Sequence, residues 1–180
     1  MATPIQILSE KHFAQRDSFF NQKQACSSTL SAIARDWEDF LGAKEDAVRL
    51  FRPSEQLREG DQFQLPKMLT TPYGALEMTR EGAWCARLAL ILEIEKGTWP
   101  KALYWVELQF RVIDDEVVVQ VTGNPSRERF ESGNPADEKL RRFSNRVTRI
   151  FNKKVVALES FFDKSNRAYR PLLKNGKLND

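Results

Sequence analysis

Apolar and polar side chains alternate through the middle of the chain. From residue 84 to 94 the even-numbered positions are apolar, and the same alternation returns from 102 to 112. A period of two is typical of a strand that buries one face. The pattern therefore predicts consecutive antiparallel strands at 84–94, 102–112 and 117–121, and one apolar face requires helices to cover it.

Turn residues between these segments set the expected pairing. Residues 96–100 are predicted to form a loop, and Asp114-Asp115 a two-residue hairpin turn. Matching apolar positions places Leu90 opposite Val106 and Phe110 opposite Val119. A fourth strand is expected at 74–78, with Leu76 and Met78 facing inward.

Helical spacing dominates the first quarter of the chain. Ser9 is expected to cap a helix that runs to about residue 22, and Ser27 or Ser28 to cap a second one. In the second helix, apolar residues recur every three or four positions, as in a buried stripe: Leu30, Ile33, Trp37 and Phe40. Gly42 is expected to kink this helix, which continues to Phe51 before Pro53 ends it.

A second helical pattern begins after Asn134-Pro135. A capping side chain, a proline and the acids Asp137-Glu138 together form a strong helix start. Apolar residues then share one arc to Phe162, so residues 135–162 are predicted to form the helix that covers the sheet. Beyond Ser165 a basic, loosely ordered tail is expected.

These elements predict one α+β domain over 1–180: an antiparallel three- or four-stranded meander covered by N-terminal helices and a long C-terminal helix. The expected ranges are about 9–51 for the N-terminal helices, 74–122 for the sheet, 135–162 for the C-terminal helix and 165–180 for the tail.

Composition narrows the class of protein. The 180 residues include 12 Phe and four Trp, enough bulky material to exclude disorder throughout. No apolar run is long enough to span a bilayer, so no membrane is expected. The first residues lack the pattern of a signal peptide. Two cysteines make a disulfide scaffold improbable and favour reduced thiols in the cytoplasm.

The charge is unevenly distributed. The net charge is +3, yet residues 126–180 alone carry +7 and the remainder −4. Within the predicted C-terminal helix, basic residues recur every three or four positions beside the apolar arc. Arg146, Arg149 and Lys153 have no acid three or four positions away. A candidate anion- or nucleic-acid-binding face therefore comprises Arg142, Arg146, Arg149 and Lys153. A solvated helix flank explains the same pattern.

Aromatic residues on the polar side of the sheet suggest a second surface. Leu103 and Trp105 share that face, and Trp99 lies in the adjoining loop. Such a patch is a candidate protein-binding surface, and sheet aromatics also stack bases in some RNA-binding domains. Alternatively, the N-terminal helices cover this face with the aromatic side chains that they carry: Phe13, Phe19, Phe20 and Trp37.

The sequence contains few residues arranged for catalysis. His12 is the only histidine, and no serine or cysteine stands at a diagnostic spacing from it. Cys85 is expected opposite Arg111, which would lower its pKa, although an inert buried thiol is the simpler interpretation. The acids 114–116 fit a solvated turn, and no glycine-rich phosphate loop is present. We therefore expect no catalytic residues, no metal and no cofactor.

Two functions follow as expectations. The first is a non-enzymatic cytoplasmic interaction or assembly protein that binds another protein or itself. The second is a nucleic-acid-binding protein that uses the basic face of the C-terminal helix. An enzyme that uses carboxylates ranks third.

Overall fold

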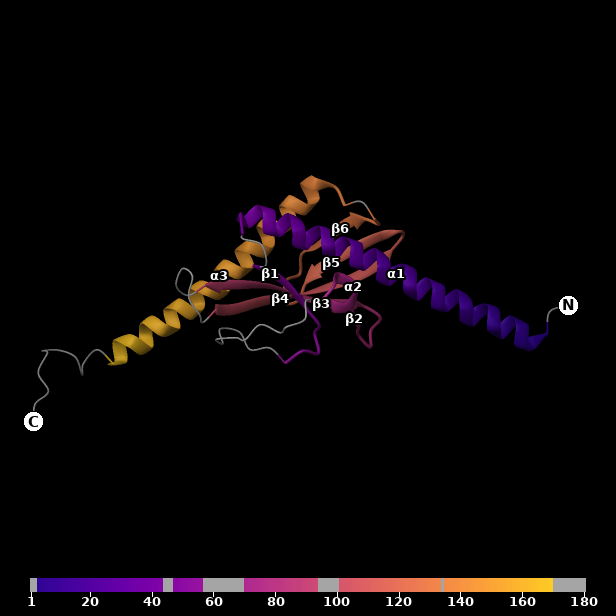
Figure 1. Ribbon diagram of the computed structural model, residues 1–180, viewed down its shortest axis with the longest axis horizontal. Coiled ribbons are helices and arrows are strands. Elements are labelled where there is room, and N and C mark those ends of the chain that lie inside the picture. Colours follow the sequence, from indigo (N-terminus) through magenta and orange to yellow (C-terminus); the bar gives the residue numbers. More distant parts are fainter. Residues whose placement is uncertain (1–2, 44–46, 57–69, 94–100, 134, 170–180) are drawn as a thin grey trace, which may run out of the picture.

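A computed structural model describes residues 3–43, 47–56, 70–93, 101–133 and 135–169, with side chains at all of these except 93, 101–102 and 156–169 (Figure 1). Its elements are α1 (Pro4–Leu41), β1 (Val48–Phe51), α2 (Pro72–Ala75), β2 (Glu77–Met78), β3 (Trp84–Glu93), β4 (Lys101–Ile113), β5 (Glu116–Val121), β6 (Arg127–Glu131) and α3 (Asp137–Tyr169). The strands form one antiparallel sheet in the order β1-β3-β4-β5-β6, and β2 also pairs with β3. The α+β class is confirmed.

Both long helices pack on the same face of the sheet. Apolar side chains of α1 and α3 form a single core with the even-numbered side chains of β3 and β4. Trp37 of α1 is fully buried, and its ring lies 4.7 Å from that of Phe151 on α3. The Trp37 Nε1–H donates to Thr148 Oγ1 at 3.0 Å, so one residue joins the two helices.

The N-terminal region is one helix instead of two. Thr3 and Gln6 form a reciprocal capping box, and Pro4 occupies the first turn, so the helix begins five residues before the predicted cap at Ser9. Ser27 and Ser28 lie inside the helix, because no Gly or Pro interrupts it before Leu41. Gly42, with φ 56°, ends the helix and does not kink it.

The predicted helical continuation to Phe51 is wrong. Residues 48–51 form β1, which pairs with β3 so that Leu50 lies opposite Leu88. The Ile91 amide also donates to the carbonyl of Ala47 at 2.8 Å. Pairing satisfies the backbone groups at the outer edge of β3, and this long-range contact outweighs the local helical spacing.

The even-numbered side chains of β3 and β4 face the main core as predicted. The odd-numbered face of β3 is buried too, at Cys85, Ala89 and Ile91, and the predicted pairing of β3 with β4 is wrong by two residues. Leu90 lies opposite Tyr104, and Val106 opposite Leu88. A shift of two preserves the face on which every side chain lies, so alternation cannot distinguish the two registers. The shift also sets Arg87 directly opposite Glu107.

The pairing of β4 with β5 agrees with the prediction. Phe110 lies opposite Val119, and Val112 opposite Val117. Asp114 and Asp115 form the two-residue turn with φ values of 50° and 63°. Positive φ at both positions is the geometry of the tight hairpin turn whose twist matches that of the strands.

The sheet differs from the prediction at both ends. Residues 72–75 form the short helix α2 in place of strand, and only Glu77–Met78 pairs with β3; Leu76 is buried, but Met78 is 41% exposed. At the other end β6, which was not predicted, pairs with β5. Its sequence RERFE carries one apolar side chain, Phe130, and therefore shows no alternation.

Helix α3 confirms the predicted C-terminal helix and extends it. It runs from Asp137 to Tyr169, beyond the expected end at 162 and into the residues expected to be tail. Residues 170–180 lie outside the described part of the chain. Leu140, Phe143 and Val147 are buried against the sheet.

Candidate functional site

The basic face of α3 is partly neutralised by β6. Arg146 Nη2 lies 3.0 Å from Glu128 Oε2, and Arg142 Nη2 lies 4.0 Å from Glu128 Oε1. The side chain of Glu128 is only 15% exposed, and that of Arg146 is 28% exposed. Arg146 therefore serves a partly buried ion pair on the flank of the fold, and a ligand would compete with Glu128 for it.

A second set of polar contacts joins α3 to α1. Ser144 Oγ donates to Asp36 Oδ2 at 2.5 Å, and Arg141 Nε lies 3.9 Å from Asp36 Oδ1. Arg141 also lies over the ring of Phe40, 5.4 Å from its centroid. These contacts fix the two helices relative to each other, so Arg141 has a structural role.

Arg149 and Lys153 are the exposed remainder of the basic face. Neither has an ion pair or hydrogen bond with any residue in the described part of the chain. Two positive charges one turn apart form a smaller anion-binding surface than the four residues that the sequence suggests.

The aromatic patch on the other sheet face is a second small core. Leu103 is 1% exposed and packs with Phe51, Ala89 and Ile91, and the half-buried Trp105 lies against them. Leu103 therefore has no surface to offer a partner. The N-terminal helix does not cover this face as the alternative prediction had it, because α1 lies on the opposite side of the sheet. Trp99 falls outside the described residues.

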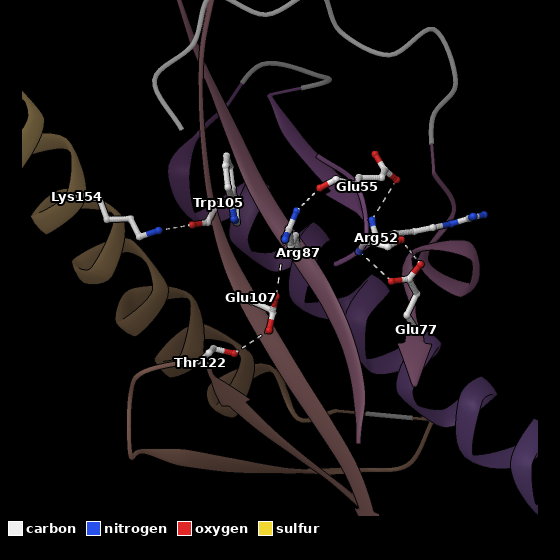
Figure 2. Close-up of polar contacts among 9 residues, drawn as sticks. Arg52, Glu55, Glu77, Arg87, Trp105, Glu107, Thr122 and Lys154 are labelled. Atoms are coloured by element: carbon white, nitrogen blue, oxygen red, sulfur yellow. Dashed lines mark hydrogen bonds and ion pairs between the residues drawn. The ribbon is translucent and has the colours of Figure 1, made fainter. Parts of the chain in front are cut away.

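Polar contacts surround Trp105 (Figure 2). Arg87 lies 5.5 Å from the centroid of the Trp105 ring and donates from Nη1 to the Glu55 carbonyl at 2.5 Å. Arg87 Nε lies 3.9 Å from Glu107 Oε2, and Lys154 Nζ donates to the Trp105 carbonyl at 2.7 Å. These contacts connect β3, β4, α3 and the segment after β1, and they hold the second core in place.

Most of the exposed large apolar side chains in the described part of the chain lie on the first half of α1. Residues 4–20, which we call the α1 arm, are all exposed and project beyond the sheet in Figure 1. The first buried residue of the helix is Cys26. Six large apolar side chains of the arm face solvent: Ile5 (72%), Ile7 (43%), Leu8 (67%), Phe13 (52%), Phe19 (39%) and Phe20 (50%).

The alternative prediction that the aromatic residues of the arm cover the second sheet face is wrong, because Phe13, Phe19 and Phe20 are exposed. The length of the helix is the signal that predicts that the arm projects beyond the sheet. A helix of 38 residues is about 57 Å long, whereas the ten residues of β3 span about 33 Å. An uninterrupted helix of this length cannot lie wholly over such a sheet.

The described residues show no catalytic arrangement. His12 lies on the exposed arm. Burial raises the pKa of Cys26 to about 12 and that of Cys85 to about 11, so neither thiol is a ready nucleophile. Cys85 lies opposite Gln109 and not Arg111, as a result of the shifted register.

Candidate ligands for a metal are also scattered. Within the described ranges, no three His, Cys, Asp or Glu side chains converge to hold an ion. Asp114 and Asp115 are exposed at their turn, and Glu116 pairs with Arg129 at 3.1 Å. No described helix has the length and apolarity needed to cross a bilayer.

Comparisons with known proteins complete the description of the site. The chain matches no family model, no curated protein and no solved structure. Among the described residues, the α1 arm carries most of the exposed large apolar side chains.

Proposed function

We propose that the protein is a non-enzymatic interaction and assembly protein, and that the α1 arm binds the arm of a second copy. One observation carries the proposal: large apolar side chains are exposed along the arm, and of these Phe19 also contacts Trp84 of β3, at 4.8 Å between ring centroids. At about 100° per residue, five of them lie within an arc about 140° wide: Ile5, Leu8, Phe13, Phe19 and Phe20.

This arc continues the stripe with which α1 packs in its own core. Cys26, Leu30 and Trp37 occupy the same side of the helix as Leu8 and Phe19. The apolar stripe that packs against the sheet and α3 in the second half of α1 therefore continues past the Phe19–Trp84 contact and is exposed at Leu8 and Ile5. A helix with an open apolar stripe gains stability when another helix closes it.

The exposed area is sufficient for a specific dimer. The five side chains are 39–72% exposed. At about 200 Å² for a whole side chain, the aromatic value taken for all five, one arm exposes roughly 600 Å². Two arms would thus bury roughly 1,200 Å², at the lower end of specific interfaces. We expect a dissociation constant in the micromolar range, because area alone does not give high affinity.

The charges of the arm favour a second copy over other partners. Residues 4–20 contain two acids, Glu10 and Asp17, and two fixed cations, Lys11 and Arg16. A balanced arm does not repel its copy, and it lacks the basic face that draws amphipathic helices to anionic lipid. Antiparallel packing about His12 brings Ile5 of one arm beside Phe19 and Phe20 of the other and opposes the helix dipoles.

Replacing Leu8 and Phe13 together by Asp is expected to raise the dimer dissociation constant at least tenfold, because two charges would enter the apolar seam. Sedimentation equilibrium of the full chain from roughly 1 to 100 µM measures this. The matched control, Ala14→Asp with Ser18→Asp, adds the same charge to the opposite side of the arm and should leave the constant unchanged. A monomeric wild-type chain, or equal effects of both variants, would refute self-association.

Cross-linking tests the antiparallel orientation within the same proposal. In an antiparallel pair, His12→Cys lies near the two-fold axis and forms an intermolecular disulfide under mild oxidation, whereas Ile5→Cys does not. In a parallel pair, both would link. Cys26 and Cys85 are buried and do not interfere.

The proposal includes a cytoplasmic location. It is supported by two free cysteines that lie in separate, buried positions of the fold. Free thiols of this kind are typical of proteins in reducing compartments.

Nucleic-acid binding is the second candidate, favoured by the two exposed cations Arg149 and Lys153. If it is correct, Arg149→Glu with Lys153→Glu abolishes a gel shift seen with single- or double-stranded DNA or RNA. Each lost phosphate contact lowers the salt slope by about one unit. Arg146 is left intact, since Glu at that position would face Glu128 and disturb the fold. No gel shift at low salt would exclude this function. An equal gel shift for the wild type and the variant at both salt concentrations would exclude Arg149 and Lys153 as the binding residues.

A further inference from the structure

The outer half of the sheet leaves one face open. Both long helices lie on the even-numbered side, so the odd-numbered side chains of β4 and the facing ones of β5 and β6 are not covered by them. The register places Arg111, Val118 and Arg129 in one row across the three strands. Gln109, Gln120 and Arg127 form the next row. Three arginines therefore surround one valine on this open face.

A concavity of about 210 Å³ occupies this face, lined by Gln109, Arg111, Ile113, Val118, Gln120 and Arg127. Val118, which is 7% exposed, and Ile113 provide its apolar surface, and two guanidinium and two amide groups provide its polar surface. No carboxylate is among the lining side chains. This site shares no residue with the α1 arm, so it goes beyond the proposed function and does not depend on it.

Part of the lining is held in place by hydrogen bonds. Arg127 Nε donates to Gln120 Oε1 at 3.2 Å, and Gln120 Nε2 donates to the Asn124 carbonyl at 2.7 Å. These bonds orient Arg127 while leaving its terminal N–H groups available. Donors that are ordered before binding lose less entropy when a ligand arrives.

Arg111 supplies the first of two positive charges at the pocket. Its side chain makes no hydrogen bond or ion pair with any described residue, although its charge acts on the surroundings. The pKa of Glu81 is lowered, mainly by a hydrogen bond with Thr79 and to a smaller extent by Arg111. Arg129, by contrast, is neutralised by Glu116 at 3.1 Å. The open positive charge is thus that of Arg111 together with Arg127.

We propose that this pocket binds a small phosphate monoester, with Arg111 and Arg127 on the phosphate oxygens and the organic group over Val118. The Cα atoms of these arginines lie two strands and two residues apart, roughly 12 Å, and two extended arginine side chains can meet at an anion between them. Two guanidinium groups match the charge of about −2 on a monoester, whereas a carboxylate or a phosphodiester would leave one of them unbalanced.

Calorimetric titration of the full chain at constant ionic strength tests the proposal with four probes: inorganic phosphate, phenyl phosphate, dimethyl phosphate and acetate. We expect saturable binding of the first two, tighter for phenyl phosphate because of the apolar floor, and no measurable binding of the diester or acetate. Dimethyl phosphate represents the phosphodiester of a nucleic acid backbone, so its binding as strongly as phenyl phosphate would overturn the assignment to a monoester.

Matched arginine variants locate the site. Arg111→Gln and Arg127→Gln are each expected to weaken phenyl phosphate binding at least about fivefold, since each removes a charge-assisted contact. Arg129→Gln removes the same charge from the same face but from a residue already paired with Glu116, and it should leave the affinity unchanged. All three side chains are exposed, so the variants fold. Absence of saturable phosphate binding by the wild type, or equal weakening by all three variants, would overturn the proposal.

Discussion

Replacing Trp37 by Ala is expected to lower the free energy of unfolding by about 3–5 kcal/mol, the usual cost of removing a buried aromatic side chain. The Trp37 ring is fully buried, packs on Phe151 and donates to Thr148, so it connects α1 to α3 over the sheet. Its loss leaves a cavity at the point where these helices meet. Urea unfolding followed by far-ultraviolet circular dichroism measures the change.

The control for this prediction is Trp37→Phe. It keeps an aromatic ring against Phe151 and leaves the Thr148 hydroxyl bonded to the Ser144 carbonyl at 2.9 Å. We therefore expect it to cost clearly less than the alanine substitution. If Trp37→Ala cost less than about 1 kcal/mol, the helix contact described here would be incorrect.

Replacing Phe130 by Ala is expected to destabilise the protein by a similar amount, about 3–4 kcal/mol. Phe130 is the one buried side chain of β6, and its ring lies edge-to-face with that of Phe143 on α3, at 5.8 Å between centroids. Without it, the edge strand loses its attachment to the core. Urea unfolding gives the loss of stability, and hydrogen exchange at the amides of β6 reports whether the strand opens locally.

Glu131→Ala is the matched control on the same strand. Glu131 is exposed, and it lies opposite another acid, Glu116, in the β5–β6 pairing. Its removal should change the free energy of unfolding by no more than about 0.5 kcal/mol. Equal effects of the two substitutions would show that Phe130 does not hold β6 to the core.

Strand β6 illustrates why a polar sequence conceals an edge strand. RERFE contains one apolar residue, so neither alternation nor hydrophobicity indicates a strand. The strand forms because its backbone pairs with β5 and because Phe130 enters a core built by α3. Both causes lie in other parts of the chain.

The proposed binding surfaces also depend on contacts that the local sequence pattern does not reveal. Helical spacing predicts that four basic residues share one flank of α3: Arg142, Arg146, Arg149 and Lys153. Glu128, which neutralises Arg146, lies on the strand that spacing did not reveal. Similarly, the sequence pattern does not show that the apolar stripe of the α1 arm and the pocket on the outer sheet face are exposed. Their exposure depends on where the other elements pack.

The sequence by itself determined which side chains of β3, β4 and β5 share a face, the Asp114-Asp115 turn and the helix that begins near residue 137. Each of these depends on the spacing of neighbouring residues, which periodicity and turn chemistry report directly. The tertiary structure alone decided the β3–β4 register, the strand at 48–51, the partner of Arg146 and the projection of the α1 arm. These depend on contacts between residues distant in the chain, and a two-residue shift or an uncovered helix leaves the local pattern of apolar and polar positions unchanged.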